Sequence, residues 1–156
     1  RHNMVGGLIF IDLDNFKEVN DTLGHEIGDK LLIMVAKKIN ETIRKEDTIA
    51  RIGGDEFIVL ADSIGANESE AKENMSYLAE KIKLAMNSIL EIDGHKNIST
   101  PSIGVTLFCD SSVCIQDLIK QADTAMYQAK EAGRNQVVLF EPKVKETLDS
   151  SWGMDY

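Results

Sequence analysis

The first strongly apolar stretch of the chain is residues 5–16, VGGLIFIDLDNF. Its apolar side chains follow one another almost without interruption, which is typical of a strand buried on both faces. Asp12 and Asp14 interrupt the end of this stretch. The pattern therefore predicts a central strand that ends in carboxylates.

Helical spacing of apolar residues predicts three long helices, in residues 28–44, 68–89 and 114–133. In the first of them the apolar positions are Leu31, Leu32, Val35, Ile39 and Ile43. A short helix and a glycine-punctuated loop are expected in residues 17–30. Gly133 is expected as the residue that ends the last helix, because glycine is common just after a helix C-terminus.

The remaining apolar segments predict strands. Residues 47–62 read as a hairpin in which Gly53 and Gly54 supply the positive φ angles of a two-residue turn. Residues 98–108 and 135–140 each predict one further strand. This order of elements indicates an α+β fold on the ferredoxin-like plan, with a mostly antiparallel sheet and helices on one face.

Length and charge narrow the classes of function. The chain has 156 residues, 43% of them hydrophobic, which indicates one globular domain. Its net charge of −9 argues against a nucleic-acid partner, which would require a basic face. A phosphate ligand remains compatible with a local group of Lys and Arg. No apolar run approaches the roughly 20 residues of a membrane span, so we expect no membrane contact.

Two carboxylates are candidates for one site. Asp12 ends the first predicted strand, and Asp55 lies at the predicted hairpin turn. If the two strands are neighbours, the carboxylates converge and repel unless a cation lies between them. Mg²⁺ or Mn²⁺ suits such a site, because Mg²⁺ is usually held by one or two carboxylates together with substrate phosphates. The alternative is an acidic turn that simply faces water.

The chain resembles the GGDEF family of diguanylate cyclases. The resemblance is carried by the signature Gly53-Gly54-Asp55-Glu56-Phe57, by FIDLDNFKEVNDTLGHEIGDKLL and by ADTAMYQAKEAGRNQVV. It implies a GGDEF domain over residues 1–140, a tail or linker over residues 141–156, and a ferredoxin-like palm similar to adenylyl cyclase catalytic domains. The activity it implies is the joining of two GTP molecules into cyclic di-GMP, with release of pyrophosphate.

The resemblance also implies roles for individual residues. The implied metal ligands are Asp12, the backbone carbonyl of Leu13, Asp55 and Glu56. The implied catalytic residues are Asp55, Glu56 and Lys17, with Lys17 contacting phosphate. The implied substrate-binding residues are Asn20 and Asp29 for guanine, Gly53 and Gly54 in the turn, and Lys130 and Arg134 for phosphates. We expect Lys130 and Arg134, four residues apart, to share one helix face.

Arg44 and Asp47 match the RxxD motif at which members of this family bind their product and are inhibited. The alternative for this motif is an ordinary ion pair at a helix end. One domain would hold one GTP, so activity implies a homodimer. The resemblance implies a cytoplasmic location. The alternative is that the domain forms the cytoplasmic part of a larger, membrane-anchored sensor protein. Three rival functions are a GTP-binding module that regulates a neighbouring phosphodiesterase, a receptor for cyclic di-GMP, and an ATP cyclase, which Asp29 disfavours.

Overall fold

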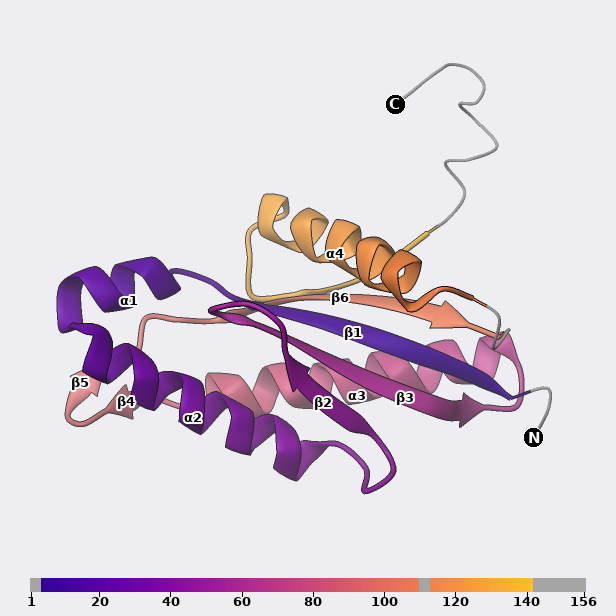
Figure 1. The fold of residues 1–156 in the computed structure, drawn as a ribbon, viewed down its shortest axis with the longest axis horizontal. Helices are drawn as coiled ribbons and strands as arrows, with labels where there is room; N and C mark the ends of the chain where they lie inside the picture. The colour runs from indigo at the N-terminus through magenta and orange to yellow at the C-terminus, as the bar shows by residue number, and fades with distance from the viewer. Residues whose placement is uncertain (1–3, 110–112, 142–156) are drawn as a thin grey trace, which may run out of the picture.

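A five-stranded sheet forms the centre of the protein, seen here in a computed structural model that describes residues 4–109 and 113–141 (Figure 1). The strands lie in the order β2-β3-β1-β6-β7, and all neighbours are antiparallel except β6 and β7. This confirms the predicted α+β class. The tail predicted for residues 141–156 lies outside the described residues after Glu141. The strand bounds are β1 Val5–Leu13, β2 Thr48–Arg51, β3 Glu56–Gly65, β6 Pro101–Phe108 and β7 Val137–Leu139.

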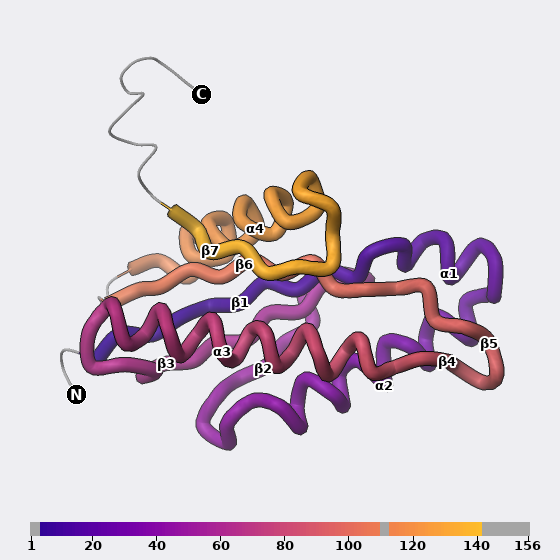
Figure 2. Tube along the Cα trace, turned by 180° about the vertical axis from the view of Figure 1, so that it is seen from behind, coloured from indigo at the N-terminus to yellow at the C-terminus, as the bar shows by residue number. Residues whose placement is uncertain are grey.

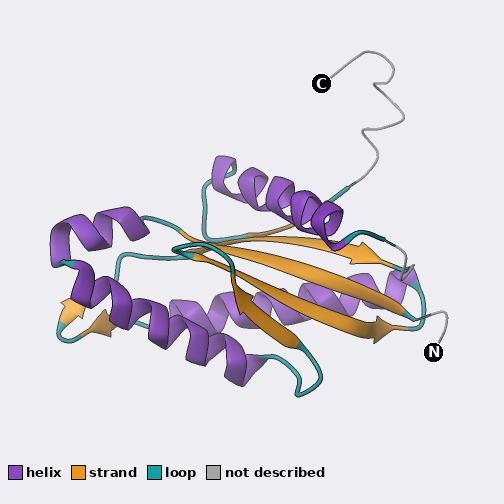
Figure 3. Ribbon diagram, in the orientation of Figure 1, coloured by secondary structure: helices purple, strands orange, loops and turns teal. Residues whose placement is uncertain are grey.

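Helices cover both faces of the sheet, so the prediction that they lie on one face was wrong (Figures 1 and 3). Leu8 and Phe10 of β1 pack in one apolar cluster with α4, while Ile9 and Ile11 belong to a separate, larger core. The uninterrupted apolar run of β1 requires this arrangement, because alternate side chains point to opposite faces. The helices are α1 Phe16–Leu23, α2 His25–Thr42, α3 Glu68–Asn87 and α4 Ile115–Glu131.

A small second hairpin lies beside α2 (Figure 2). Its strands are β4 Glu91–Ile92 and β5 His95–Lys96. The turn between them is formed by Asp93 and Gly94, which have φ angles of 50° and 83°. Asp93 accepts an ion-paired hydrogen bond from Lys30 of α2. The two-residue strands were not predicted, because they are too short for an alternation pattern.

The C-terminal end of α4 agrees with the pattern of the sequence. Gly133 follows the last helix with φ 124°, and its N–H bonds the Lys130 carbonyl oxygen over 3.3 Å. The next N–H, of Arg134, bonds the Ala129 carbonyl oxygen over 2.9 Å, which completes the hydrogen-bond pattern common at glycine-capped ends. None of the helices within the described ranges has the length and apolarity needed to cross a membrane.

Candidate active site

The C-terminal end of β1 carries the first group of candidate residues. Asp12 lies opposite Glu56 in the pairing of β1 with β3. One step further, the Leu13 N–H donates a hydrogen bond to the Asp55 carbonyl oxygen over 3.1 Å. Directly opposed residues of antiparallel strands have neighbouring side chains on one face. Asp12 and Glu56 are therefore neighbours, and the charge of Asp55 acts on both of them. These three residues are here named the carboxylate edge.

The ionised form of this edge is electrostatically unfavourable. Burial, followed by repulsion from Asp55, raises the pKa of Asp12 to about 7, and the nearby Lys130 ammonium only partly opposes the shift. Burial, then the Asp55 and Asp123 carboxylates, also raises the pKa of Glu56. Desolvation and like charges both disfavour the ionised form of a carboxyl group. The edge thus favours a bound proton or cation over free negative charge.

The donor set fits a hard divalent cation. No three His, Cys, Asp or Glu side chains within the described ranges are arranged as a ready-made metal centre. Mg²⁺ does not require one, since it keeps several waters and takes one or two carboxylates plus substrate phosphates. The Leu13 N–H points toward β3, where it bonds the Asp55 carbonyl oxygen, and the Leu13 carbonyl oxygen lies on the same side of the strand, next to the turn that carries Asp55. The carboxylate edge and that carbonyl therefore offer oxygen donors suited to Mg²⁺ or Mn²⁺.

Asp14 is the residue that sequence reasoning missed. Its side chain has no exposed surface, and its carboxylate accepts four hydrogen bonds. The donors are the Thr100 hydroxyl at 2.6 Å, the Ser102 hydroxyl at 2.7 Å, the Lys130 ammonium at 2.8 Å and the Asn135 N–H at 3.3 Å. The available signal was the run Ser-Thr-Pro-Ser at 99–102, which brings hydroxyl groups to the strand beside β1.

Lys130 and Arg134 do not share a helix face, contrary to the prediction. Lys130 lies in the last turn of α4, whereas Arg134 follows the glycine cap with a left-handed φ of 66°. Spacing alone could not show this, because Gly133 ends the helix between them. Both cations still approach Asp14: the Lys130 Nζ at 2.8 Å and the Arg134 Nε at 3.9 Å. The Lys130 Nζ also lies 3.7 Å from Asp12 Oδ1.

The turn between β2 and β3 also differs from the prediction. Neither Gly53 nor Gly54 has a positive φ angle, so they do not form a tight two-residue turn. The connection is longer, because the ladder is closed by a bond of 2.9 Å from the Ile52 N–H to the Glu56 carbonyl oxygen. Arg51, to which sequence reasoning gave no role, holds the turn. Its Nε lies 3.1 Å from the Gly53 carbonyl oxygen and 3.2 Å from that of Gly54.

The two glycines leave space around the turn and do not adopt positive φ angles. A Cβ atom at Gly53 would lie 2.6 Å from a carboxylate oxygen of Glu56, so a side chain there would displace that carboxylate. A Cβ atom at Gly54 would meet nothing within 4 Å. The backbone at Gly54 is therefore open to a close approach by a ligand.

Asn20 and Asp29 lie on the two helices that follow β1. Asn20 is in α1, and Asp29 is one residue beyond Gly28 in α2. The Asn20 side chain occupies the space above Gly28, where a Cβ atom would lie 1.9 Å from its Oδ1. Gly28 therefore allows the α1 side chain to reach the start of α2. Sequence reasoning gave Gly28 no role.

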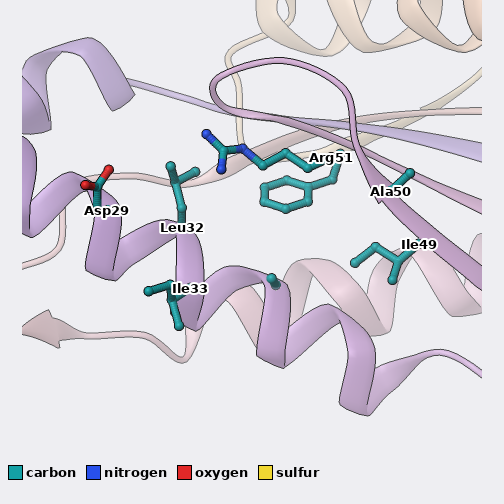
Figure 4. A pocket seen from close by; sticks show the side chains of 8 residues that line it. Asp29, Leu32, Ile33, Ile49, Ala50 and Arg51 are labelled. Atoms are coloured by element: carbon teal, nitrogen blue, oxygen red, sulfur yellow. The ribbon is translucent and has the colours of Figure 1, made fainter.

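Asp29 opens onto a cavity of about 570 Å³ between α2 and β2 (Figure 4). A volume of this size is within the usual range for small-molecule sites. The walls are mainly apolar, with the Asp29 carboxylate and the Arg51 guanidinium as the charged groups. Asn20 is not among the lining residues, which are Asp29, Leu32, Ile33, Ala36, Ile49, Ala50, Arg51 and Phe57.

Lys17 lies at the start of α1, exposed to solvent. Its ammonium pairs with Asp21 one helical turn later, over 2.8 Å. This hydrogen bond, followed by the charge of Asp21, raises the pKa of Lys17. The side chain is thus held on the helix surface and has no contact with the carboxylate edge among the recorded ion pairs of the described chain.

Arg44 and Asp47 bond to each other. The Arg44 Nε lies 3.0 Å and 3.1 Å from the two Asp47 carboxylate oxygens, and a second guanidinium nitrogen lies 2.6 Å from one of them. The Asp47 side chain is fully buried, and that of Arg44 is 34% exposed. Arg44 also borders a cavity of about 230 Å³ that includes Tyr77 and Lys81. We name these two residues the Arg44–Asp47 pair; only its arginine faces the cavity.

Comparison with protein families identifies the chain. The geometry described above is that of an α+β domain with carboxylates at the end of β1 and a mainly apolar cavity between α2 and β2. A family model for the diguanylate cyclase GGDEF domain matches residues 1–136. The chain belongs to the GGDEF family.

Two curated relatives come from Pseudomonas aeruginosa. The bifunctional diguanylate cyclase/cyclic di-GMP phosphodiesterase MucR is 41% identical over 134 residues, which is 86% of this chain and 19% of MucR. The cyclic di-GMP phosphodiesterase NbdA is 37% identical over 133 residues, 85% of this chain and 16% of NbdA. The chain therefore spans less than a fifth of the length of either relative.

Solved structures share the fold. The GGDEF domain of YfiN, also called TpbB, from Pseudomonas aeruginosa matches with a TM-score of 0.80 and 35% identity, over 90% of this chain and 84% of that one. The GGDEF domain of DgcB from Caulobacter crescentus, solved in complex with cyclic di-GMP, matches with a TM-score of 0.76 and 27% identity. That match covers 87% of this chain and 78% of the DgcB chain.

Proposed function

We propose that this domain is a diguanylate cyclase that condenses two GTP molecules into cyclic di-GMP. The observation that carries the proposal is the carboxylate edge, where burial and mutual repulsion raise the pKa of Asp12 to about 7. Such an arrangement suits a site that binds a cation together with a negatively charged substrate. The membership of the chain in the GGDEF family, some of whose members are named diguanylate cyclases, supports the same activity.

Asp12, Asp55, Glu56 and the Leu13 carbonyl would hold Mg²⁺ or Mn²⁺. When bound, such an ion supplies charge stabilisation for the phosphates and activates an attacking oxygen. Glu56 would hold the proton of the attacking 3′-hydroxyl or serve as a further ligand. Its raised pKa makes the carboxylate a better proton acceptor than an ordinary glutamate.

The reaction occurs twice for each product. In each step the 3′-oxygen of one GTP forms a bond to the α-phosphorus of the other, and the bond from that phosphorus to the pyrophosphate oxygen breaks. The hydroxyl proton leaves with the base, and pyrophosphate is released. Lys17, Lys130 and Arg134 would bind the phosphates.

Guanine recognition would rest on Asp29 and Asn20. The N1–H and N2–H₂ groups of guanine are adjacent donors, which one carboxylate can accept together, and an amide can bond the remaining edge. The Asn20 side chain reaches Gly28, the residue before Asp29, so the two polar groups lie on neighbouring parts of α1 and α2. Adenine would place an unprotonated N1 against the Asp29 carboxylate, which would then lack a donor partner wherever the bound base covers it, and such a mismatch gives strong discrimination.

The active form would be a homodimer. Each domain presents one carboxylate edge and one guanine site, whereas the reaction joins two nucleotides. Two domains facing each other across a twofold axis place each 3′-hydroxyl near the other α-phosphate. Product inhibition would occur at the Arg44–Asp47 pair, where Arg44 faces the adjacent cavity. The solved complex of the DgcB GGDEF domain with cyclic di-GMP supports product binding.

The test is incubation of the purified domain at high concentration with GTP and Mg²⁺, followed by chromatography. Cyclic di-GMP from the wild type, and none from Asp55→Ala, is the expected result. If the wild type makes no product even when fused to a dimerising coiled coil, the proposal fails.

The second candidate is a GTP-binding module that regulates a neighbouring phosphodiesterase. The similarity to NbdA, which is named only as a phosphodiesterase, favours it. The intact Gly53-Gly54-Asp55-Glu56-Phe57 signature of this chain favours the enzyme. Tight GTP binding by calorimetry without turnover in the fused dimer would select the module.

A further inference from the structure

Asp14 joins the end of β1 to two regions that lie far from it in the sequence. Its carboxylate accepts hydrogen bonds from Thr100 and Ser102 at the start of β6, and from Lys130 and Asn135 around the end of α4. Its own backbone is fixed as well, since its N–H bonds the Thr100 carbonyl oxygen over 2.7 Å and its carbonyl accepts the Ser99 hydroxyl at 2.8 Å. A buried carboxylate this well bonded has one position and one set of partners.

The first consequence concerns Lys130. A lysine ammonium on a flexible four-carbon stem samples many positions unless an anion fixes it. Here the Lys130 Nζ lies 2.8 Å from Asp14 and 3.7 Å from Asp12, with a side chain only 20% exposed. Asp14 therefore holds this cation at the carboxylate edge without taking part in the edge itself.

The second consequence concerns the turn after α4. Arg134 and Asn135 both have left-handed backbones, with φ angles of 66° and 52°. Such angles are uncommon outside glycine and persist when the surroundings enforce them. Two bonds do so: the Asn135 N–H to Asp14, and the Asn87 amide to the Asn135 amide oxygen over 2.9 Å. The direction in which Arg134 leaves the turn thus depends on Asp14.

We propose that Asp14 is a positioning residue of the nucleotide site, which fixes the Lys130 ammonium and the Arg134 turn so that both cations face the phosphates. This inference rests on the proposed binding of GTP at the carboxylate edge. It does not make Asp14 a ligand, because its carboxylate has no exposed surface and its acceptors are already bonded.

The test is the affinity for a GTP analogue with a methylene group between the α- and β-phosphates, measured by calorimetry with Mg²⁺. Asp14→Asn keeps the size of the side chain but removes the charge and turns an acceptor into a donor. We expect a Kd about 10- to 100-fold higher, the usual effect of removing the residue that orients a ligand-binding group. GMP, which lacks the outer phosphates, should lose less affinity than the analogue.

A double-mutant cycle separates positioning from general damage. If Asp14 acts through Lys130, Asp14→Asn should have a much smaller effect in a Lys130→Ala background than alone. In an Asn20→Ala background, which removes a proposed guanine contact and none of the bonds to the Asp14 carboxylate, its effect should be undiminished. Equal fold-changes in both backgrounds would overturn the inference, as would an unchanged Kd of a folded Asp14→Asn protein.

A milder variant decides the matter if Asp14→Asn does not fold. Thr100→Val with Ser102→Ala removes two hydroxyl donors and leaves the carboxylate and Lys130 in place. We expect this pair to raise the Kd about 3- to 10-fold, since the carboxylate loses two of its four fixed partners. An unchanged Kd would overturn the inference.

The experiments distinguish a failure of the proposed cyclase activity from a failure of this inference. A wild type that binds the analogue but does not cyclise GTP, with the expected loss in Asp14→Asn, would overturn the activity and support the positioning role. Turnover with an Asp14→Asn affinity equal to wild type would do the reverse. A wild type that does not bind the analogue would overturn both.

Discussion

The carboxylate edge and the Arg44–Asp47 pair differ in how far their negative charges are compensated by neighbouring positive charges. At the edge, Asp12 lies among like charges, and the nearest recorded cation within the described residues, Lys130, is 3.7 Å away and bonded more closely to Asp14. At the pair, a buried carboxylate has both oxygens bonded to one guanidinium. The edge is electrostatically incomplete, and the pair is complete without any ligand.

This difference separates residues whose removal should lower activity from residues whose removal should lower the free energy of unfolding. Clustered carboxylates destabilise the native state and are relieved by a cation, so their removal should cost activity and not stability. A fully paired buried carboxylate should behave the other way, because breaking the pair leaves one charge unsatisfied. The following variants test that contrast.

Asp55→Ala should have the largest effect on activity. We expect cyclic di-GMP formation to fall about 1,000-fold or more, because charge stabilisation worth several kcal/mol is lost and each 1.36 kcal/mol is tenfold in rate. The free energy of unfolding should stay equal or rise slightly, since Asp12 loses a repelling neighbour. The measurements are product chromatography and urea unfolding.

The matched control is Asp62→Ala, which removes an exposed carboxylate from β3, the strand that follows Asp55. It should retain activity and stability. If Asp55→Ala is inactive because it is unfolded, the contrast between the two regions is wrong.

The second prediction concerns pH. The folded pKa of Asp12 is about 7, against an ordinary value of 3.8, so the native state binds this proton more tightly than the unfolded state. Its stabilising contribution is therefore fully present below about pH 4 and is lost as the pH rises through 7. The loss is on the order of 4 kcal/mol if Asp12 alone titrates over this interval.

Urea unfolding from pH 4.5 to 8, with and without Mg²⁺, measures this effect. Asp12→Asn should remove most of the decline, and Mg²⁺ should restore stability at pH 8 in the wild type, since a ligand that binds only the native state stabilises it. Identical pH profiles for wild type and Asp12→Asn would show that the edge is not strained.

The fold was largely predictable because its strongest signals are local. The unbroken apolar run of β1 predicts a strand buried on both faces, and Gly133 predicts the end of α4. The same signal in β1 already implied cover on both sides, although the general plan suggested one. The prediction that Arg134 shares a helix face with Lys130 was wrong because it used only the four-residue spacing. The glycine cap at Gly133 ends the helix between them and changes the direction of the chain.

The site was predictable where a residue contacts a ligand and not where it contacts another residue. Asp12, Asp55 and Glu56 stand out as carboxylates at strand ends. Asp14 also stands out as a carboxylate, but its role could not be predicted, because that role depends on hydroxyls, a lysine and a backbone N–H from segments about 85 to 120 residues away. Arg51 bonds the backbone of the neighbouring turn, and Gly28 leaves space for the Asn20 side chain. The pattern of residue types in the sequence predicts neither contact.

Arg44→Ala tests the opposite side of the comparison. It leaves the fully buried Asp47 carboxylate without its guanidinium, so the free energy of unfolding should fall by about 1–3 kcal/mol, the usual cost of an unsatisfied buried polar group. Lys45→Ala, at an exposed neighbour, should leave stability unchanged. Initial rates of the folded Arg44→Ala enzyme should stay near those of the wild type and become insensitive to added cyclic di-GMP. A stable Arg44→Ala protein that is still inhibited would contradict both expectations.

Lys17→Ala should have the smallest effect, because Lys17 belongs to neither kind of region. Its ammonium is solvated and paired with Asp21 on the surface of α1, and an exposed charge contributes little to either stability or binding. We expect unchanged urea unfolding and a KM for GTP about threefold higher, since a solvated ammonium adds only a weak phosphate contact. Asp21→Ala is the matched control: it frees the ammonium and should lower the KM or leave it unchanged. A loss of kcat of about a hundredfold in Lys17→Ala would instead mean that Lys17 leaves Asp21 to contact the reacting phosphate, as its place among the implied catalytic residues suggests.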